Sequence, residues 1–417
     1  MSDRRVVVTG MGALTPIGNN VDDFWQGLQD GVSGARPITN FDASKFKTRF
    51  ACELRGFDPK EYFDRKEIRK LDPFVQYALV SVDEAVKHSG VNIDNVDPNR
   101  AGVIWGSGIG GLETFYEEVK NFAEGDGTPR FNPFFIPKMI IDIAAGHISM
   151  KYGLQGVNYS TVSACASSAN AIAEAYNYIV HNKADLVVSG GSEAVIIPPA
   201  IGGFNSMKAL SERNDEYETA SRPFDQTRDG FVMGEGSGAF ILEEYETAKA
   251  RGANIYAEIV GTGMSADAYH ITAPDPDAVG AKAVMHNALK DSQINKEDID
   301  YINVHGTSTP LGDKAELKAI KEVFGDHAYN LNISSTKSMH GHLLGAAGSV
   351  EAIGCIKGLL NDLVPPTINH QHDDPEIDEK LNLTLNEPQE RKMNYALSNA
   401  FGFGGHNVSL ILKKFGC

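Results

Sequence analysis

The chain has 417 residues, of which 42% are hydrophobic and 22% charged, and its formal net charge is −17. This composition predicts a globular protein with room for two domain-sized units, and the negative charge argues against nucleic acid or an anionic membrane as the main partner. No apolar run approaches the roughly 20 residues that span a bilayer, and the N-terminus lacks the apolar core of a signal peptide. The four cysteines have no paired spacing, so we expect no disulfide framework, no zinc site and a reducing, cytoplasmic setting.

Strand-like apolar runs alternate with helical patterns along the whole chain. This alternation is typical of α/β architecture in which the strands are buried on both faces. We predict one helix over residues 66–89, ending before Gly90, from its apolar residues at helical spacing. A second helix is predicted after Pro310, where Asp313 and Glu316 resemble a capping pair.

Three segments of the first part of the chain recur in the same order in the second part. The pairs are 8–12 with 260–264, 103–108 with 302–307, and the segment around residue 165 with 334–342. Each similarity is weak, but an ordered series of three is hard to obtain by accident. We therefore predict two similar halves, 1–250 and 251–417, packed into one unit.

The segment around Cys165 consists of very small residues between a strand-like stretch and a helical pattern that begins near Ala169. A thiol at the N-terminal end of a helix has a lowered pKa, and small neighbours leave room for a substrate. The same segment is equally compatible with a buried structural cysteine. By itself it favours neither interpretation.

Three further features add to this cysteine. His305 ends an apolar strand, His342 opens a helix of small residues, and the glycine-rich loop 402–405 precedes a strand. Taken singly, each feature is also compatible with a structural role: His305 with a core histidine, His342 with a surface histidine, and the loop with a hairpin turn. Taken together, a thiol, two imidazoles and backbone N–H groups in a flexible loop suit acyl transfer through a thioester better than they suit zinc binding.

At this point the chain resembles the thiolase-fold condensing enzymes, and specifically the β-ketoacyl-acyl-carrier-protein synthases of the I/II type. The similarity runs from Val6 to Lys414 and is close to the synthase II branch of bacterial fatty-acid synthesis. It implies a thiolase-like fold, with two duplicated α/β/α halves in a five-layered αβαβα core, and an acyltransferase that is a homodimer. The segments that carry the resemblance are 161–171, 228–236, 305–310, 335–338, 341–342 and 402–405.

The resemblance also implies roles for individual residues. Cys165 would carry the acyl chain, and His305 and His342 would stabilise the enolate formed when malonyl-acyl-carrier protein loses carbon dioxide. The backbone N–H groups of Cys165 and Phe403 would form the oxyanion hole. Supporting roles fall to Lys337 and Glu351. No organic cofactor and no catalytic metal are implied, and a structural monovalent cation is left open near Asn303, Glu351, Ser398 and Asn399.

Two more sets of residues follow from the resemblance alone. The acyl pocket and its gate would include Ile109, Phe134, Phe135 and Phe403, with Phe134 and Phe135 reaching the partner subunit's pocket. Acyl-carrier protein is acidic, so a chain that is itself negative can hold it only on a local basic patch. The positions implied for docking are Lys66, Arg69, Lys70 and Lys208.

The chain departs from the family pattern at His340, where a threonine is usual. This histidine either adds a titratable group to the site or points away from it, and the sequence leaves both open. A thiolase would need a second cysteine in the loop 402–405, and a synthase III would need asparagine in place of His342. A non-catalytic chain-length factor would lack Cys165. A ketosynthase of polyketide or other secondary metabolism, with the same chemistry, remains the alternative.

Overall fold

The computed structural model describes residues 4–416, so residues 1–3 and Cys417 lie outside the described part. The main strands are β1 (Val6–Leu14), β4 (Ala101–Gly106), β5 (Asn158–Thr161), β6 (Leu186–Glu193), β7 (Gly236–Glu244), β8 (Ala257–Ala266), β9 (Tyr301–Asn303), β10 (Asn332–Ser334), β13 (Tyr395–Gly402) and β14 (His406–Lys414). The short strands β2 (Arg36–Pro37) with β3 (Phe50–Ala51), and β11 (Leu363–Val364) with β12 (Gln389–Glu390), form two small ladders.

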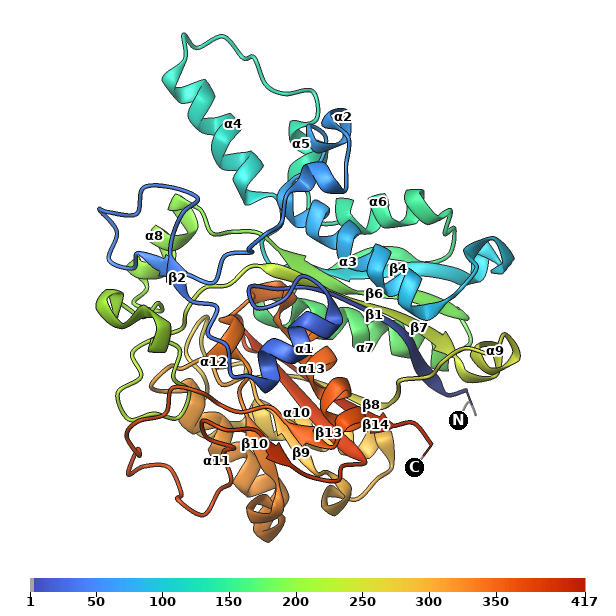
Figure 1. Ribbon diagram of the computed structural model, residues 1–417, viewed down its shortest axis with the longest axis vertical. Coiled ribbons are helices and arrows are strands. Elements are labelled where there is room, and N and C mark those ends of the chain that lie inside the picture. Colours follow the sequence, from blue (N-terminus) through green and yellow to red (C-terminus); the bar gives the residue numbers. More distant parts are fainter. Residues whose placement is uncertain (1–3, 417) are drawn as a thin grey trace.

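The main strands form one ten-stranded sheet in the order β10-β9-β13-β14-β8-β1-β7-β6-β4-β5 (Figure 1). From the central β1–β8 pair outward, both halves repeat the same pairing: antiparallel, antiparallel, parallel, parallel. The first two recurring segments lie at corresponding strands in the two halves, on β1 and β8 and at β4 and β9. The third pair follows β5 and β10, but the turn that has the form of the Cys165 turn is Leu344–Ala346, just after the segment 334–342. The chain passes between the halves after α9 (Tyr245–Ala250), and the boundary at residue 250 itself stays a prediction.

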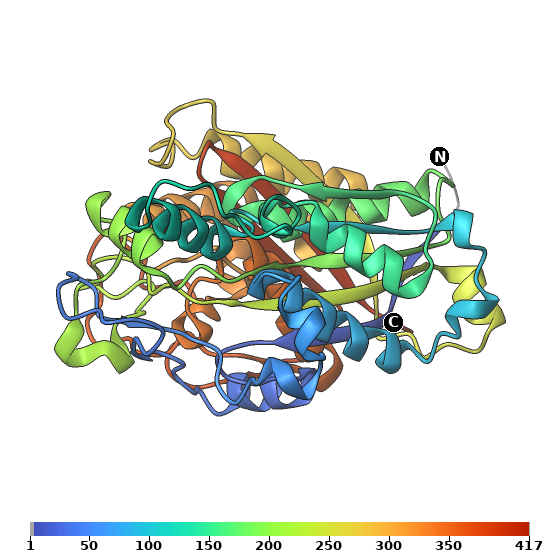
Figure 2. The same ribbon diagram turned by 90° about the horizontal axis from the view of Figure 1, so that it is seen from above.

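Helices cover both faces of each half-sheet (Figures 1 and 2). In the middle layer α7 (Ser167–Val180) packs against α13 (Ala347–Asn361). The outer layers are α3 (Pro73–Ser89) with α6 (Ile143–Tyr152) on one side, and α10 (Val279–Ser292) with α11 (Gly312–Phe324) on the other. The remaining helices are α1 (Val21–Gln29), α2 (Arg65–Ile68), α4 (Leu112–Glu124), α5 (Phe135–Met139), α8 (Pro198–Ser206) and α12 (Lys337–His340).

Glycines explain why the first recurring segment is detectable in the sequence. A Cβ atom at Gly12 of β1 would lie 1.9 Å from the carbonyl oxygen of Ser81 in α3, and one at Gly263 of β8 would lie 2.1 Å from that of Val284 in α10. In both halves the outer helix therefore approaches the first strand so closely that no side chain fits.

The prediction of one continuous helix over residues 66–89 is wrong in its first part. It is divided into α2, which ends at Ile68, and α3, which begins at Pro73. Proline has no N–H and suits only the first turn of a helix, so a new helix starts there, with the side chain of Asp72 accepting from the N–H of Phe74 at 3.2 Å.

An arm formed by α4, α5 and their connection projects from the body of the molecule (Figure 1). Its surface is unusually apolar, because large side chains expose between 40% and 56% of their area. These side chains belong to Phe115, Val119, Phe122, Phe131, Phe134 and Ile136. Exposed apolar side chains gathered on one projecting segment are typical of a contact face.

Candidate active site

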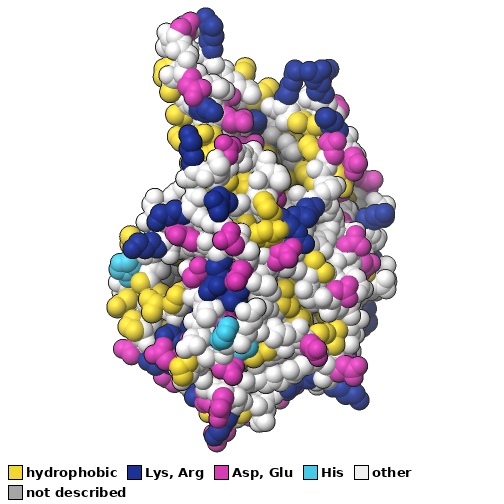
Figure 3. Space-filling view, turned by 60° about the vertical axis from the view of Figure 1, so that its left-hand side comes forward, with side chains coloured by type: hydrophobic (Ala, Val, Ile, Leu, Met, Phe, Trp, Pro, Cys, Tyr) yellow, Lys and Arg dark blue, Asp and Glu magenta, His cyan; other side chains and the backbone are white. Residues whose placement is uncertain are grey.

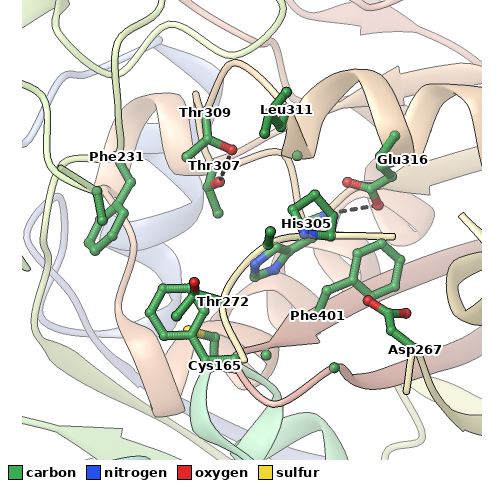
Figure 4. A pocket seen from close by; sticks show the side chains of 18 of the residues that line it. Cys165, Phe231, Asp267, Thr272, His305, Thr307, Thr309, Leu311, Glu316 and Phe401 are labelled. Atoms are coloured by element: carbon green, nitrogen blue, oxygen red, sulfur yellow. Dashed lines mark hydrogen bonds between the residues drawn. The ribbon is translucent and has the colours of Figure 1, made fainter. Parts of the chain in front are cut away.

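A cavity of about 480 Å³ brings together Cys165, His305 and His342, which are far apart in the sequence. Figure 4 shows Cys165 and His305 at this cavity. Phe401 and Phe403 line the same cavity, at the end of β13. Cys165 lies in a strand-to-helix turn and His305 follows the strand β9, the places where α/β folds expose functional groups. His342 does not open a helix as expected, because it lies between α12 and the 3-10 helix that precedes α13.

The turn that holds Cys165 is set by its small neighbours. Ala164 has a φ of 51°, in the left-handed region, and starts a short 3-10 helix that leads into α7. The hydroxyl of Ser167 accepts from the N–H of Ser163 at 3.0 Å and donates to the carbonyl of Ala164 at 2.7 Å. The strand-to-helix turn predicted from the sequence is therefore present, and it leaves Cys165 only 8% exposed at the cavity wall.

The prediction that this position lowers the pKa of the thiol is wrong for the free protein. Burial raises the pKa of Cys165 to about 12, and the charge of Glu193 acts in the same direction. The positive charge of Lys337 and the backbone N–H groups of Phe403 and Cys165 lower the pKa, but they do not outweigh the loss of water around the sulfur. The side chain of Cys165 is therefore a neutral thiol in the free protein.

The imidazoles of His305 and His342 face each other edge to face, with ring centroids 5.2 Å apart and planes at 86°. Burial, followed by the charge of Lys337, holds the pKa of both groups well below the ordinary value. Both rings are therefore neutral at pH 7, and each can donate one hydrogen bond. Phe231 packs edge-on against His342 at 5.3 Å, and Phe401 lies 5.7 Å from His305.

A buried ion pair joins Lys337 of α12 to Glu351 of α13. Both side chains are at most 1% exposed, and burial raises the pKa of Glu351 to about 7. Because the lysine charge acts on Cys165 and on both site histidines, the pair controls the local charge without lining the cavity.

Sequence reasoning missed the role of Glu316. Its carboxylate accepts from the N–H groups of His305 and Gly306, both at 2.9 Å, and from the side-chain amide of Asn399 at 3.0 Å. The predicted capping pair is wrong, because α11 begins at Gly312 without a side-chain cap. The sequence did contain one signal for this role. At helical spacing Glu316 falls on the same face of α11 as the apolar residues, so its carboxylate is buried and needs hydrogen-bond partners.

The glycine-rich loop presses on the cysteine turn. A Cβ atom at Gly402 would lie 2.4 Å from the carbonyl oxygen of Ser163, so only glycine allows this approach. Gly404 has a φ of 88° and donates its N–H to the carbonyl of Ile271 at 2.8 Å. This arrangement keeps the N–H of Phe403 beside the sulfur of Cys165.

Other residues singled out from the sequence lie outside the cavity lining. Ile109 packs in the apolar cluster that contains Cys165. Phe134 and Phe135 lie on the arm, where Phe135 stacks on Phe131 at 5.5 Å. A single chain therefore does not bring these two phenylalanines to its own site.

The four basic residues predicted to dock a carrier protein lie in two places. Lys208 is exposed at the cavity lining. Lys66, Arg69 and Lys70 are exposed at α2, and the Lys70 ammonium lies 5.5 Å from the ring centre of Phe134. Figure 3 shows Lys and Arg side chains at the upper end of the molecule, where Figure 1 places α2 and the arm.

His340, the departure from the family pattern, is fully buried and does not line the cavity. Burial lowers its pKa to about 3, so it does not titrate near pH 7.

Within residues 4–416, no helix has both the length and the apolar character required to cross a bilayer. In the same range, no three His, Cys, Asp or Glu side chains gather as metal ligands would.

Comparison with known proteins agrees with this geometry. Residues 3–248 match the family described as Beta-ketoacyl synthase, N-terminal domain, and residues 256–371 match Beta-ketoacyl synthase, C-terminal domain. The chain is 50% identical over 414 residues to the 3-oxoacyl-(acyl-carrier-protein) synthase 2 of Coxiella burnetii (strain RSA 493 / Nine Mile phase I), with 99% of each chain covered.

Solved structures show the same relationship. A beta-ketoacyl synthase from Burkholderia phymatum STM815 superposes with a TM-score of 0.91 at 36% identity, covering 99% of both chains. A second solved structure is the complex of a type II polyketide synthase acyl-carrier protein with its ketosynthase bound to the hexaketide. A chain of this complex superposes with a TM-score of 0.89 at 32% identity, and 99% of both chains is covered. The duplicated, thiolase-like α/β fold predicted from the sequence is thus confirmed.

Proposed function

The chain belongs to the beta-ketoacyl synthase family, and we propose that it condenses malonyl-acyl-carrier protein with an acyl chain held on Cys165, as a 3-oxoacyl-(acyl-carrier-protein) synthase 2 of fatty-acid elongation. The observation that carries the proposal is the convergence of one thiol and two neutral imidazoles on one cavity. This set provides a nucleophile for acyl transfer and two hydrogen-bond donors for an enolate.

In the first step the sulfur of Cys165 attacks the thioester carbonyl of an acyl-carrier protein. A carbon–sulfur bond to Cys165 forms, the bond to the carrier sulfur breaks, and the thiol proton ends on the departing carrier thiol. The N–H groups of Cys165 and Phe403 stabilise the negative oxygen of the tetrahedral intermediate. The Lys337 charge favours the thiolate as it forms.

In the second step the malonyl thioester loses carbon dioxide, and the electron pair of the broken bond becomes an enolate. His305 and His342 donate hydrogen bonds to the enolate oxygen, which neutral imidazoles can do without proton transfer. The carbanion then attacks the acyl carbonyl on Cys165, forms the new carbon–carbon bond and releases the cysteine thiolate, which takes up one proton. The product is a 3-oxoacyl chain two carbons longer on the carrier protein.

For the partner, we infer an acyl-carrier protein that docks on Lys66, Arg69, Lys70 and Lys208. These cations are exposed on a chain of net charge −17, so they offer local positive potential to an acidic partner. We expect the double reversal Lys66→Glu and Arg69→Glu to raise KM about tenfold for carrier-bound substrates and to leave free thioester analogues within about twofold. Equal losses for both kinds of substrate would exclude the docking role.

We further infer a cytoplasmic homodimer. The apolar surface of the arm would be buried between subunits, which would let Phe134 and Phe135 approach the pocket of the other subunit, while Ile109 and the ring of Phe403 would shape the acyl pocket and its entrance. Sedimentation analysis of the parent and of Phe134→Asp tests this state. A parent that sediments as a monomer at micromolar concentration would exclude it.

No organic cofactor enters these steps. A monovalent cation of structural role fits near Asn303, Glu351, Ser398 and Asn399, because Oδ1 of Asn303 and Oε2 of Glu351 are buried oxygens without a hydrogen-bond partner. Oxygen donors are those that hard cations prefer. Bound there, the ion would satisfy these two oxygens.

The overall proposal is tested in two stages with the purified chain. Incubation with an acyl-acyl-carrier protein is expected to add the mass of the acyl group to Cys165, located by peptide mapping. Addition of malonyl-acyl-carrier protein is then expected to release carbon dioxide and the 3-oxoacyl product. Acylation without condensation would contradict the proposal.

The 50% identity to a synthase 2, against 32% to the polyketide ketosynthase complex, favours the fatty-acid substrate over a polyketide one.

A further inference from the structure

His340 is a buried histidine without access to the cavity, placed two residues before a site histidine. It ends α12, and its exposed area is 0%. A fully buried imidazole must have both nitrogens satisfied or lose stability. Both nitrogens of His340 have partners, and these partners reveal what the ring holds in place.

The partners of His340 define its tautomer. Nδ1 lies 2.8 Å from the carbonyl oxygen of Gly341, which can only accept, so Nδ1 carries the proton and donates. Nε2 lies 3.0 Å from Oγ1 of Thr336 and therefore accepts the hydroxyl proton. The ring is neutral, since burial and then the Lys337 charge lower its pKa to about 3.

The chain of hydrogen bonds continues to the strand that leads to His305. The side-chain amide of Asn303 donates to Oγ1 of Thr336 at 3.3 Å, and Asn303 ends β9 two residues before His305. Three hydrogen bonds thus connect the strand that positions His305 with the backbone next to His342.

The peptide between Gly341 and His342 is held at both of its polar atoms. Its oxygen accepts from His340, and its N–H, that of His342, donates to the carbonyl of Val232 at 2.7 Å. Gly341 has a φ of 73°, and a Cβ atom there would lie 2.8 Å from the sulfur of Cys52. The residue before His342 therefore has a conformation that favours glycine, and a freely rotating peptide at this point would swing the imidazole.

We propose that His340 is a positioning residue, whose Nδ1–H locks the Gly341–His342 peptide and, through Thr336 and Asn303, sets the spacing of the His305 and His342 rings. This inference rests on the proposed function, in which both rings donate to one enolate oxygen. Two donors converge on one atom only when both are held within a fraction of an ångström, and misplacement by about 1 Å costs up to about 100-fold in rate.

The role predicts an unequal effect on the two chemical steps. Acyl transfer uses Cys165 and backbone N–H groups of Cys165 and Phe403, none of which contacts His340 among the described hydrogen bonds. Decarboxylation uses the two rings. A positioning role therefore slows carbon dioxide release and spares acylation, whereas a purely structural role lowers both together with the melting temperature.

The test compares His340→Leu, which removes both hydrogen bonds, with His340→Asn, whose side-chain N–H can still donate to the Gly341 carbonyl. We expect His340→Leu to lower carbon dioxide release from malonyl-acyl-carrier protein at least about tenfold, with acylation of Cys165 within about twofold. His340→Asn is expected to restore release to within about threefold of the parent. Thr336→Val removes the partner of His340 Nε2 and the acceptor of the Asn303 amide but leaves the Nδ1–H bond to Gly341 in place, so it should show a smaller loss in the same step.

Unchanged carbon dioxide release in a folded His340→Leu protein would overturn the inference, and so would equal losses in both steps. A parent that acylates but releases no carbon dioxide would instead overturn the proposed function. A crystal structure of His340→Leu gives a readout independent of activity. There the separation of the His305 and His342 rings is expected to differ from the 5.2 Å of the parent, and an unchanged separation would contradict the role.

Discussion

The turn that carries Cys165 and the turn that precedes α13 have the same backbone form. Ala164 and Leu344 have φ values of 51° and 48°, and each starts a three-residue 3-10 helix that runs directly into a central helix. The second residue differs. Cys165 presents its sulfur to the cavity, whereas Gly345 has no side chain and is buried.

Gly345 has no room for a reactive group. A Cβ atom there would lie 2.2 Å from the backbone nitrogen of Gly108 and 2.5 Å from Oε2 of Glu193, to which the N–H of Gly345 donates at 2.9 Å. The second turn therefore braces the loop after β4, which carries Ile109.

Each half uses a buried carboxylate to hold the loop after its corresponding strand. Glu193 accepts from Ser107, Gly108, Ile109, Gly110 and Gly345. Glu316 holds the backbone at His305 in the other half. Duplication thus supplies two similar backbone turns, and packing determines which turn exposes a side chain to the cavity and which one supports a neighbouring loop.

The largest expected effect comes from removing the thiol from the Cys165 turn, which leaves this turn without a reactive group, like the turn at Gly345. Cys165→Ala is expected to lower acyl loading by at least about 10³-fold, because no other cysteine of the described residues lines the cavity. The free energy of unfolding should change by less than about 1.5 kcal/mol, since backbone and Ser167 contacts define the turn. Intact-mass and denaturation measurements check both values. Normal loading in this variant would show that Cys165 is not the nucleophile.

The second turn should respond in the opposite way. Gly345→Ala is expected to destabilise the protein by about 3 kcal/mol, because the added methyl group meets backbone and a buried carboxylate. The matched control is Gly203→Ala in α8, where a Cβ atom meets nothing within 4 Å. That control should be neutral or stabilising by up to about 1 kcal/mol in urea denaturation. Equal stability of the two variants would show that the second turn has room for a side chain after all.

The raised pKa of Cys165 predicts how the first turn reacts with an alkylating agent. Since the thiolate is the reactive form and the pKa is about 12, the alkylation rate should rise about tenfold per pH unit between pH 7 and pH 9. Mass spectrometry resolves this rate from that of the other cysteines, with Cys165→Ala as the blank. A plateau above pH 8 would mean that the thiolate is stabilised as the sequence alone suggested.

The smallest expected effect concerns the carboxylate that supports His305. Burial raises the pKa of Glu316 to about 7, above its ordinary 4.5, so the folded protein binds this proton more tightly than the unfolded chain. Its contribution to stability is fully present below about pH 4.5 and is lost as the pH rises through about 7. Between pH 6 and pH 7 the parent should lose about 1 kcal/mol that Glu316→Gln does not lose. Parallel pH profiles would contradict this assignment.

The sequence by itself determined the features that depend on local pattern. Small residues around Cys165 indicate a tight strand-to-helix turn, and the glycine pairs on β1 and β8 reveal the repeat, because close backbone approach excludes any side chain. His305 and His342 were singled out by their positions after an apolar strand and before a stretch of small residues, and the family resemblance then implied their roles. These features depend on residues that are close together along the chain, so a single sequence is enough to detect them.

The electrostatics of the site and its supporting contacts depend on the folded chain as a whole. The pKa of Cys165 depends on burial by segments far along the chain, which outweighs the helix end that the sequence suggested. The roles of Glu193, Glu316 and His340 depend on hydrogen-bond partners that folding brings together. Water removal and partner geometry are properties of the packed chain, and no local pattern encodes them.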